Sequence, residues 1–123
     1  MPDLDAIDLG VLWDCGDDYS DLGFIYSAVH ATAFEHGAAP SAVRARTIQV
    51  LSRLLDCGLI EAGYPKSGGG FTKLDLPTDE VIPFVAREWE SLGRDPGIGE
   101  IVWFVATEKG RRKLNSTRAT DDE

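Results

Sequence analysis

The chain has 123 residues, of which 43% are hydrophobic and 27% are charged, and 21 acidic against 12 basic side chains give it a formal net charge of −9. This length fits a single compact domain, and the apolar fraction excludes wholesale disorder and a fibrous repeat. No stretch approaches the roughly 18 apolar residues that a membrane span needs, and two cysteines are too few for a disulfide scaffold.

The first half of the chain is predicted to be helical. Apolar residues at helical spacing predict a short helix over residues 3–13, and residues 14–18 are typical of a turn. A longer apolar stripe predicts a second helix over residues 20–36. A third helix is expected over residues 40–57, because proline is favoured at a helix start and Gly58 fits a C-terminal stop. Its buried stripe is predicted to consist of Val43, Thr47, Val50, Leu51, Leu54 and Leu55.

Short strands and one further helix are predicted in the middle of the chain. Residues 59–64 and 71–76 are typical of short strands, and the glycine-rich residues 66–70 are typical of a flexible loop between them. A helix follows over residues 82–92. Pro83 is placed in its first turn, because a proline deeper in the helix removes a hydrogen bond and clashes with the preceding turn.

The strongest strand signal lies towards the C-terminus. A continuous apolar run predicts a strand over residues 100–106, and Thr107 is expected to cap a final helix that ends at Leu114. Residues 116–123 are polar and are predicted to be a disordered tail, so residues 1–115 are expected to form the one domain.

Two segments together resemble the winged-helix domains of bacterial regulators. Residues 50–61 contain the pattern L-x-x-L-x-x-x-G-L-I-E, which is similar to a recognition helix that runs into the first wing strand. Residues 102–111 look like the returning wing strand followed by the T-x-x-G-R start of the last helix. The resemblance implies an α+β, winged-helix-like domain in which residues 59–62 and 102–106 pair. This chain departs from the pattern by inserting a helix around Trp89 between the two wing strands, which disfavours the usual wing contact with DNA.

The acidic surplus is concentrated in the first third of the chain. Residues 1–43 hold eight acids and no lysine or arginine, whereas the remaining residues hold thirteen acids against twelve bases. Such a segment attracts cationic partners and repels phosphate backbones. The candidate partner-binding surface consists of Asp14, Asp17, Asp18 and Asp21. An acidic surface that only aids solubility is the competing interpretation.

The third predicted helix carries the candidate DNA contacts. Arg46, Gln49 and Arg53 share one face, opposite the apolar stripe, and in a DNA-binding protein they would reach phosphates and base edges. With a net charge of −9, a solvated helix face is the favoured interpretation, so nucleic acid is not the expected partner. If the four aspartates share a face with Arg46 and Arg53, DNA binding is excluded.

Catalysis, metal binding and a cofactor find no support in the residue patterns. The chain has no G-x-S-x-G, H-E-x-x-H or C-x-x-C sequence, and a spacing of six puts His30 and His36 on different helix faces. We therefore expect no enzyme activity, no metal and no cofactor.

The two cysteines and three tryptophans are expected to have structural roles. The first eight residues hold three aspartates and no basic group, unlike a signal peptide, so we expect a cytoplasmic protein in which Cys15 and Cys57 are reduced. Trp13, Trp89 and Trp103 are expected to be core or subunit-interface anchors, which is compatible with a homodimer.

The function expected from these features is that of a non-enzymatic, acidic protein-interaction module with a basic protein partner. The whole pattern also resembles a group of small actinobacterial proteins, some of them associated with toxin–immunity loci. That resemblance implies an immunity or antitoxin type of protein, which neutralises a basic toxin. The alternative is a transcriptional regulator that dimerises and binds DNA through Arg46 and Arg53.

Overall fold

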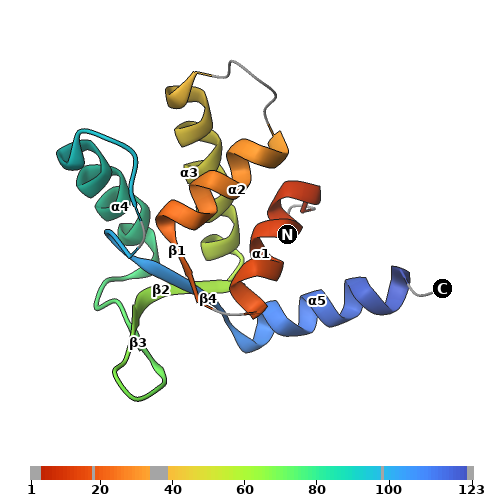
Figure 1. The fold of residues 1–123 in the computed structure, drawn as a ribbon. Helices are drawn as coiled ribbons and strands as arrows, with labels where there is room; N and C mark the ends of the chain where they lie inside the picture. The colour runs from red at the N-terminus through yellow and green to blue at the C-terminus, as the bar shows by residue number, and fades with distance from the viewer. Residues whose placement is uncertain (1–3, 18, 34–38, 98, 122–123) are drawn as a thin grey trace.

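The computed structural model describes residues 4–17, 19–33, 39–97 and 99–121, which form five helices and four strands joined by loops. In chain order the elements are α1 (Ala6–Asp17), β1 (Ser20–Asp21), α2 (Leu22–Ala33), α3 (Pro40–Asp56), β2 (Ile60–Pro65), β3 (Phe71–Lys73), α4 (Thr78–Leu92), β4 (Trp103–Ala106) and α5 (Glu108–Asp121). Helices α1, α2 and α3 gather on one side of the sheet, and α5 extends away from the body (Figure 1). The mixture of helices with an antiparallel sheet confirms the predicted α+β class.

The sheet brings together strands from both ends of the chain, in the order β1-β4-β2-β3 with every pair antiparallel. The predicted pairing of residues 59–62 with 102–106 is confirmed, because Ile60 pairs with Ala106 and Ala62 with Phe104. On its other side β4 pairs with β1, where Ser20 lies opposite Phe104. Strand β1 has only two residues and both are polar, so no alternation of apolar residues marked it in the sequence.

The hydrophobic core lies between the sheet and helices α1 to α4. The predicted buried stripe of α3 is confirmed for all its members. The polar member, Thr47, satisfies its hydroxyl by donating to the Val43 carbonyl oxygen at 2.8 Å. Trp89 of α4 is only 2% exposed, as expected of a core anchor, whereas Trp13 is 48% exposed.

Helix α1 is longer than predicted, and the expected turn over residues 14–18 is wrong for residues 14–17. Leu12 and Cys15 are fully buried, so packing extends the apolar side of the helix past Gly16. Side chains of this kind override the turn preference of glycine and aspartate when they gain burial in the core.

The predicted position of Pro83 in the first turn of its helix is also wrong. Helix α4 begins at Thr78, so Pro83 lies in its interior and interrupts the backbone hydrogen bonding. The early start adds Val81, which is 4% exposed, to the buried stripe formed with Val85 and Trp89. Burial of this extra residue favours beginning the helix before the proline. The helix ends at Gly93, as predicted, with a left-handed φ of 71°.

Other boundaries differ from the predictions. Strand β3 ends at Lys73, and β4 begins at Trp103, because Ile101 has a positive φ of 71° that interrupts an extended strand. Helix α5 continues to Asp121, where the sequence suggested a disordered tail from residue 116. Residues 122–123, like residues 34–36 of the second predicted helix, lie outside the described residues.

Thr107 caps α5, as the sequence predicted, and it also ties the helix to the end of α3. Its hydroxyl accepts a hydrogen bond from the Gly110 N–H at 3.1 Å and donates to the Gly58 carbonyl at 2.7 Å. The variant Thr107→Ala is expected to lower the free energy of unfolding by about 1–2 kcal/mol, because it removes both bonds. Urea denaturation measures this loss. Thr107→Ser keeps the hydroxyl and should lose less than half as much; equal losses would contradict the capping role.

Candidate functional site

The three residues predicted to contact DNA lie on α3, but two of them are bound to aspartates at or just before the start of α1. Arg46 donates from Nη2 to Asp5 Oδ2 at 2.5 Å and from Nη1 to Gln49 Oε1 at 2.8 Å. Arg53 donates from Nη1 to Asp8 Oδ2 at 2.5 Å. Both guanidinium groups are therefore held by carboxylates of the same chain.

Asp5 and Asp8 are placed for this role by a reciprocal cap at the start of α1. The Asp8 N–H donates to Asp5 Oδ1 at 2.9 Å, and the Asp5 N–H donates to Asp8 Oδ2 at 3.0 Å. The hydrogen bond from the Asp8 N–H lowers the pKa of the Asp5 carboxyl below its ordinary value, burial opposes this, and the Arg46 guanidinium lowers the pKa further. The predicted site residues did not include this pair, although an acceptor residue followed three positions later by a carboxylate is the sequence signature of such a capping box.

Asp8 is the most deeply placed charge of the cluster. Its side chain is fully buried, and Oδ1 has no hydrogen-bond partner in the part of the chain that the structure describes. Burying a carboxylate without a nearby cation lowers the free energy of unfolding. The ion pair with Arg53 offsets this cost for Asp8.

The third arginine of α3 is bound on the opposite side by α4. Arg44 lies 3.3 Å from the carboxylate of Glu90, donates to the Ala86 carbonyl at 3.2 Å, and has its guanidinium carbon 5.2 Å from the centre of the Trp89 ring. Each arginine of α3 is thus paired with an acid that lies in α1, in α4 or just before α1, which leaves little free positive charge on α3 for a phosphate backbone.

The four aspartates proposed as a partner-binding surface do not have equivalent positions. Asp14 is half-buried on α1, Asp17 ends that helix, and Asp18 lies outside the described residues. Asp21 is only 4% exposed, which corrects its assignment to an exposed surface. Its Oδ1 accepts the Phe24 N–H and its Oδ2 accepts the Gly99 N–H, both at 2.7 Å, so it caps α2 and anchors the loop before β4.

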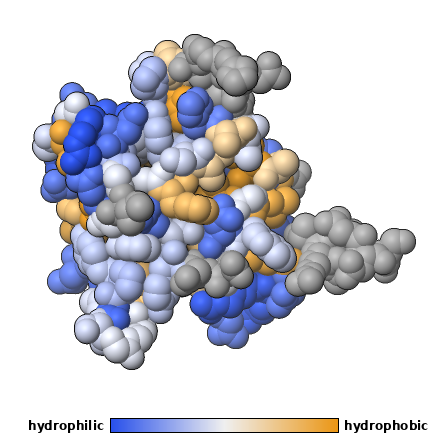
Figure 2. Space-filling view, viewed as in Figure 1, coloured by the Kyte–Doolittle hydropathy of each residue, from blue (hydrophilic) through white to orange (hydrophobic). Residues whose placement is uncertain are grey.

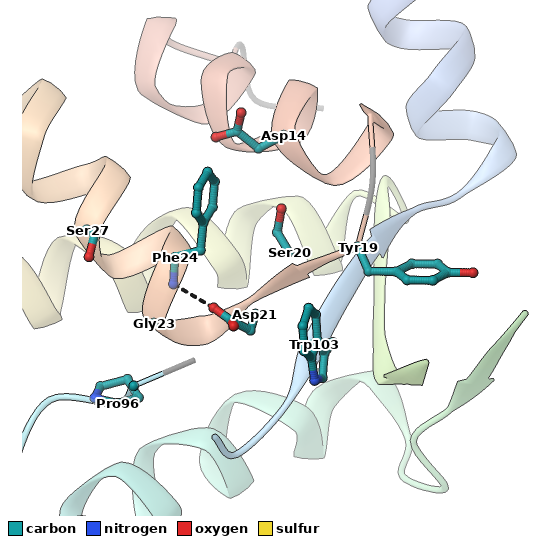
Figure 3. A pocket seen from close by; sticks show the side chains of 10 residues that line it. Asp14, Tyr19, Ser20, Asp21, Gly23, Phe24, Ser27, Pro96 and Trp103 are labelled. Atoms are coloured by element: carbon teal, nitrogen blue, oxygen red, sulfur yellow. Dashed lines mark hydrogen bonds between the residues drawn. The ribbon is translucent and has the colours of Figure 1, made fainter. Parts of the chain in front are cut away.

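Asp14 lines a pocket of about 550 Å³ between α1, α2, strands β1 and β4 and the loop before β4. Its lining residues are Asp14, Tyr19, Ser20, Asp21, Gly23, Phe24, Ser27, Pro96, Gly97 and Trp103. In Figure 3 the Phe24 ring points from α2 towards the helix that carries Asp14, and Trp103 comes from the neighbouring strand. Phe24 is 54% exposed, an unusual exposure for so large an apolar side chain. Figure 2 shows hydrophobic residues gathered over α1 and α2 on this face, bordered by hydrophilic ones.

The loop beside this pocket is held by charged contacts. Arg94 donates to both oxygens of Glu100, at 2.6 and 2.8 Å, and the Gly97 N–H donates to Glu100 Oε1 at 2.6 Å. These donors lower the pKa of Glu100 to about 2. Gly23 packs against the loop so closely that a Cβ would lie 2.7 Å from the Pro96 carbonyl oxygen. The loop that forms this wall of the pocket is therefore held by the Glu100 contacts and by close packing against Gly23.

A second groove, of about 720 Å³, follows the exposed side of α3. Gln49 and Arg53 line it together with Ile48 of the same helix, Ile82 of α4 and Lys109 of α5. Helix α4 therefore contributes one wall of the groove in which Gln49 and Arg53 lie.

The two described thiols are buried, and the described residues hold no cluster of metal-ligating side chains. Cys15 and Cys57 are both buried free thiols, and burial raises the pKa of Cys15 to about 12, far from the range of a reactive thiolate. Within residues 4–17, 19–33, 39–97 and 99–121 no group of three or more metal-ligating side chains could hold a metal ion. His30 is exposed, and His36 lies outside the described residues.

No helix in the described part of the chain is long and apolar enough to cross a membrane. Comparisons with protein-family models, with curated proteins and with solved structures gave no match.

Proposed function

We propose that this chain is a non-enzymatic protein-interaction module that binds a basic protein partner. The observation that carries the proposal is the pairing of every arginine of α3 with a carboxylate of the same chain. With these cations neutralised internally and a net charge of −9, the field of the molecule favours a cationic partner over a phosphate backbone. The partner implied by the sequence resemblance is a basic toxin, which an immunity-type contact would neutralise.

The proposed architecture is a winged-helix-like domain with β3 and α4 inserted between its wing strands. The order of the elements supports it: β1 lies between α1 and α2, α3 leads into β2, and β4 pairs with both β1 and β2. The insertion supports a changed function, because α4 covers one flank of α3 and holds Arg44.

Association kinetics test the proposed partner. The tagged chain is used to capture the products of neighbouring genes, and association with a captured basic protein is followed at rising salt. The on-rate should fall steeply with salt, because exposed charges are screened within about 8–10 Å near physiological ionic strength. Asp14→Asn with Asp17→Asn should slow association several-fold, whereas Asp75→Asn with Asp79→Asn, an equal change of charge elsewhere, should slow it less. If Asp14→Asn with Asp17→Asn associates at the wild-type rate, the acidic segment only aids solubility.

The alternative, a DNA-binding regulator, is supported by the same order of elements and by the basic start of α5, which holds Lys109, Arg111, Arg112 and Lys113. We expect no specific binding of duplex DNA at physiological salt. A footprint upstream of the chain's own gene that is lost in Arg46→Ala with Gln49→Ala would overturn the interaction-module proposal. Arg46→Ala with Gln49→Ala keeps the Arg53–Asp8 ion pair, so a loss of DNA binding in this variant would not be explained by unfolding.

A further inference from the structure

We propose that two copies of this chain associate through the groove along α3, with Asp56 of each copy facing Lys109 of the other. The groove has a volume of about 720 Å³ and is lined by residues of α3, α4 and α5. Figure 1 shows α3 between the other two helices. The inference goes beyond the proposed function, because its partner is a second copy of the chain and its residues lie outside the acidic first third.

The groove is lined by one acid and one base that form no ion pair in their own chain. Asp56 is the last residue of α3, and Lys109 lies in the first turn of α5; both are exposed. Neither takes part in an ion pair within the part of the chain that the structure describes. The third charged residue of the lining, Arg53, is already paired with Asp8. The groove therefore offers one open charge of each sign.

The stability of the two helices does not explain the signs of these charges. A helix dipole favours cations near the C-terminal end of the helix and anions near its N-terminal end. Asp56 is an acid at the end of α3, and Lys109 is a base at the start of α5. Each residue thus carries the sign that its own helix disfavours, which favours a role in contact with another molecule.

A second copy supplies the matching charges. In a twofold-symmetric dimer the same patch is used by both subunits, so a contact from one residue to another is always accompanied by the reverse contact. A patch with one open acid and one open base is complementary to itself, because two contacts between Asp56 and Lys109 form at once. Ile48 and Ile82 are partly exposed in the same groove and add apolar surface to the contact.

The distribution of charge favours this face over others for self-association. A net charge of −9 makes two copies repel each other, and residues 1–43 hold eight acids with no lysine or arginine. No described residue of that segment lines the groove. Arg111 and Arg112 follow Lys109 on α5 and make this side of the molecule more basic. Repulsion between copies is therefore expected to be smallest when these faces meet.

Helix α5 provides contact area beyond the groove itself. A groove alone buries too little surface for a stable dimer. Helix α5 continues past Leu114, which packs against the core, and extends away from the body (Figure 1). Because Lys109 in its first turn lines the groove, the exposed part of this helix is placed to contact a second copy that is bound there.

Sedimentation velocity of the full chain over a range of concentrations tests the interface. Wild type should show an equilibrium between monomer and dimer. Lys109→Glu and Asp56→Lys each bring like charges together across the interface, so each should raise the dissociation constant of the dimer about tenfold or more. Lys73→Glu and Asp75→Lys are equal changes of charge at exposed positions outside the groove, and they should leave that constant close to wild type.

A mixture of the two groove variants tests the reciprocal contact. Lys109→Glu has two acids at the groove and Asp56→Lys has two bases, so each variant repels its own copies and complements the other. The mixture should therefore form a heterodimer, and the double variant with both substitutions should recover the homodimer. Each single substitution also gives its helix end the sign that the dipole favours. Thermal unfolding should thus show no loss of stability in the monomers, so that unfolding cannot explain the loss of the dimer.

Three results would each overturn the inference: a wild type that stays monomeric at every concentration, a dimer that both groove variants retain, or groove variants that fail to combine when mixed. A dimer retained by both variants would place self-association on another face. None of these results bears on the basic partner, which the association kinetics of Asp14→Asn with Asp17→Asn test separately.

Discussion

Replacing Gly110 by alanine is expected to destabilise the protein by about 3 kcal/mol, the upper end of the usual cost of overpacking. A Cβ at this position would lie 2.1 Å from the Leu59 carbonyl oxygen and 3.2 Å from Leu12 Cδ1. The Leu59 carbonyl cannot easily retreat, because it accepts the Thr107 N–H at 2.9 Å while the Leu59 N–H donates to Leu54. The clash therefore falls on backbone that is fixed on both sides.

Urea denaturation of Gly110→Ala against wild type measures this loss. Gly10→Ala in α1 is the matched control, because nothing lies within 4 Å of its Cβ position. In an open helical position alanine is expected to raise the free energy of unfolding by about 0.5–1 kcal/mol. The close approach of α5 to β2 would be contradicted if both variants unfolded at the same urea concentration or above that of wild type.

Gly110 also explains why part of the fold could be predicted from the sequence. The T-x-x-G-R pattern describes a threonine that caps α5 and a glycine that lets the helix start touch Leu59. These two requirements act over a few neighbouring residues, so they leave a recognisable pattern. The pairing of β2 with β4 is consistent with these contacts. Thr107 directly follows β4 and Leu59 directly precedes β2, so the bond between them continues the pairing of Ile60 with Ala106.

Other parts of the fold depend on contacts that no local pattern reveals. Strand β1 is identified by its pairing with Phe104, and the start of α4 by the burial of Val81. The positive φ of Ile101 is set by the loop around it, where the Tyr64 hydroxyl donates to its carbonyl at 2.9 Å. In each case tertiary packing decides between local conformations of similar energy.

For the candidate site, too, the position of residues on a helix face could be predicted from the sequence, but their contacts could not. Helical periodicity placed Arg46, Gln49 and Arg53 on one side of α3, but their sequence gives no indication of what they contact. Their acidic partners, Asp5 and Asp8, lie 41 and 45 residues away along the chain from Arg46 and Arg53 respectively. The pocket around Phe24 is likewise assembled from separate segments, and no local pattern in the sequence distinguishes Phe24 as a residue that lines it.

The second large effect is expected from Arg53→Met, which removes the cation from the buried carboxylate of Asp8. Breaking a buried ion pair on one side costs about 3–5 kcal/mol. Because the Arg53 side chain is 25% exposed, we expect a somewhat smaller loss, of about 2–4 kcal/mol. Arg46→Met is the control: its partner Asp5 is 45% exposed, so the loss should be about 1 kcal/mol or less.

A double-mutant cycle separates the pair from the packing around it. Asp8→Leu with Arg53→Met should recover most of the stability lost in Arg53→Met, because no unpaired charge is then left in the core. Equal losses of stability in Arg53→Met and Arg46→Met would contradict a buried charge at Asp8.

The size of the stability loss in Arg53→Met also bears on the function of the protein. A base contact by Arg53 would be worth about 1–3 kcal/mol, and leaving Asp8 unpaired would cost about 2–4 kcal/mol, so the lost ion pair would cancel most or all of the gain from the contact. The ion pair with Asp8 therefore counts against the proposed alternative in which Arg53 contacts DNA.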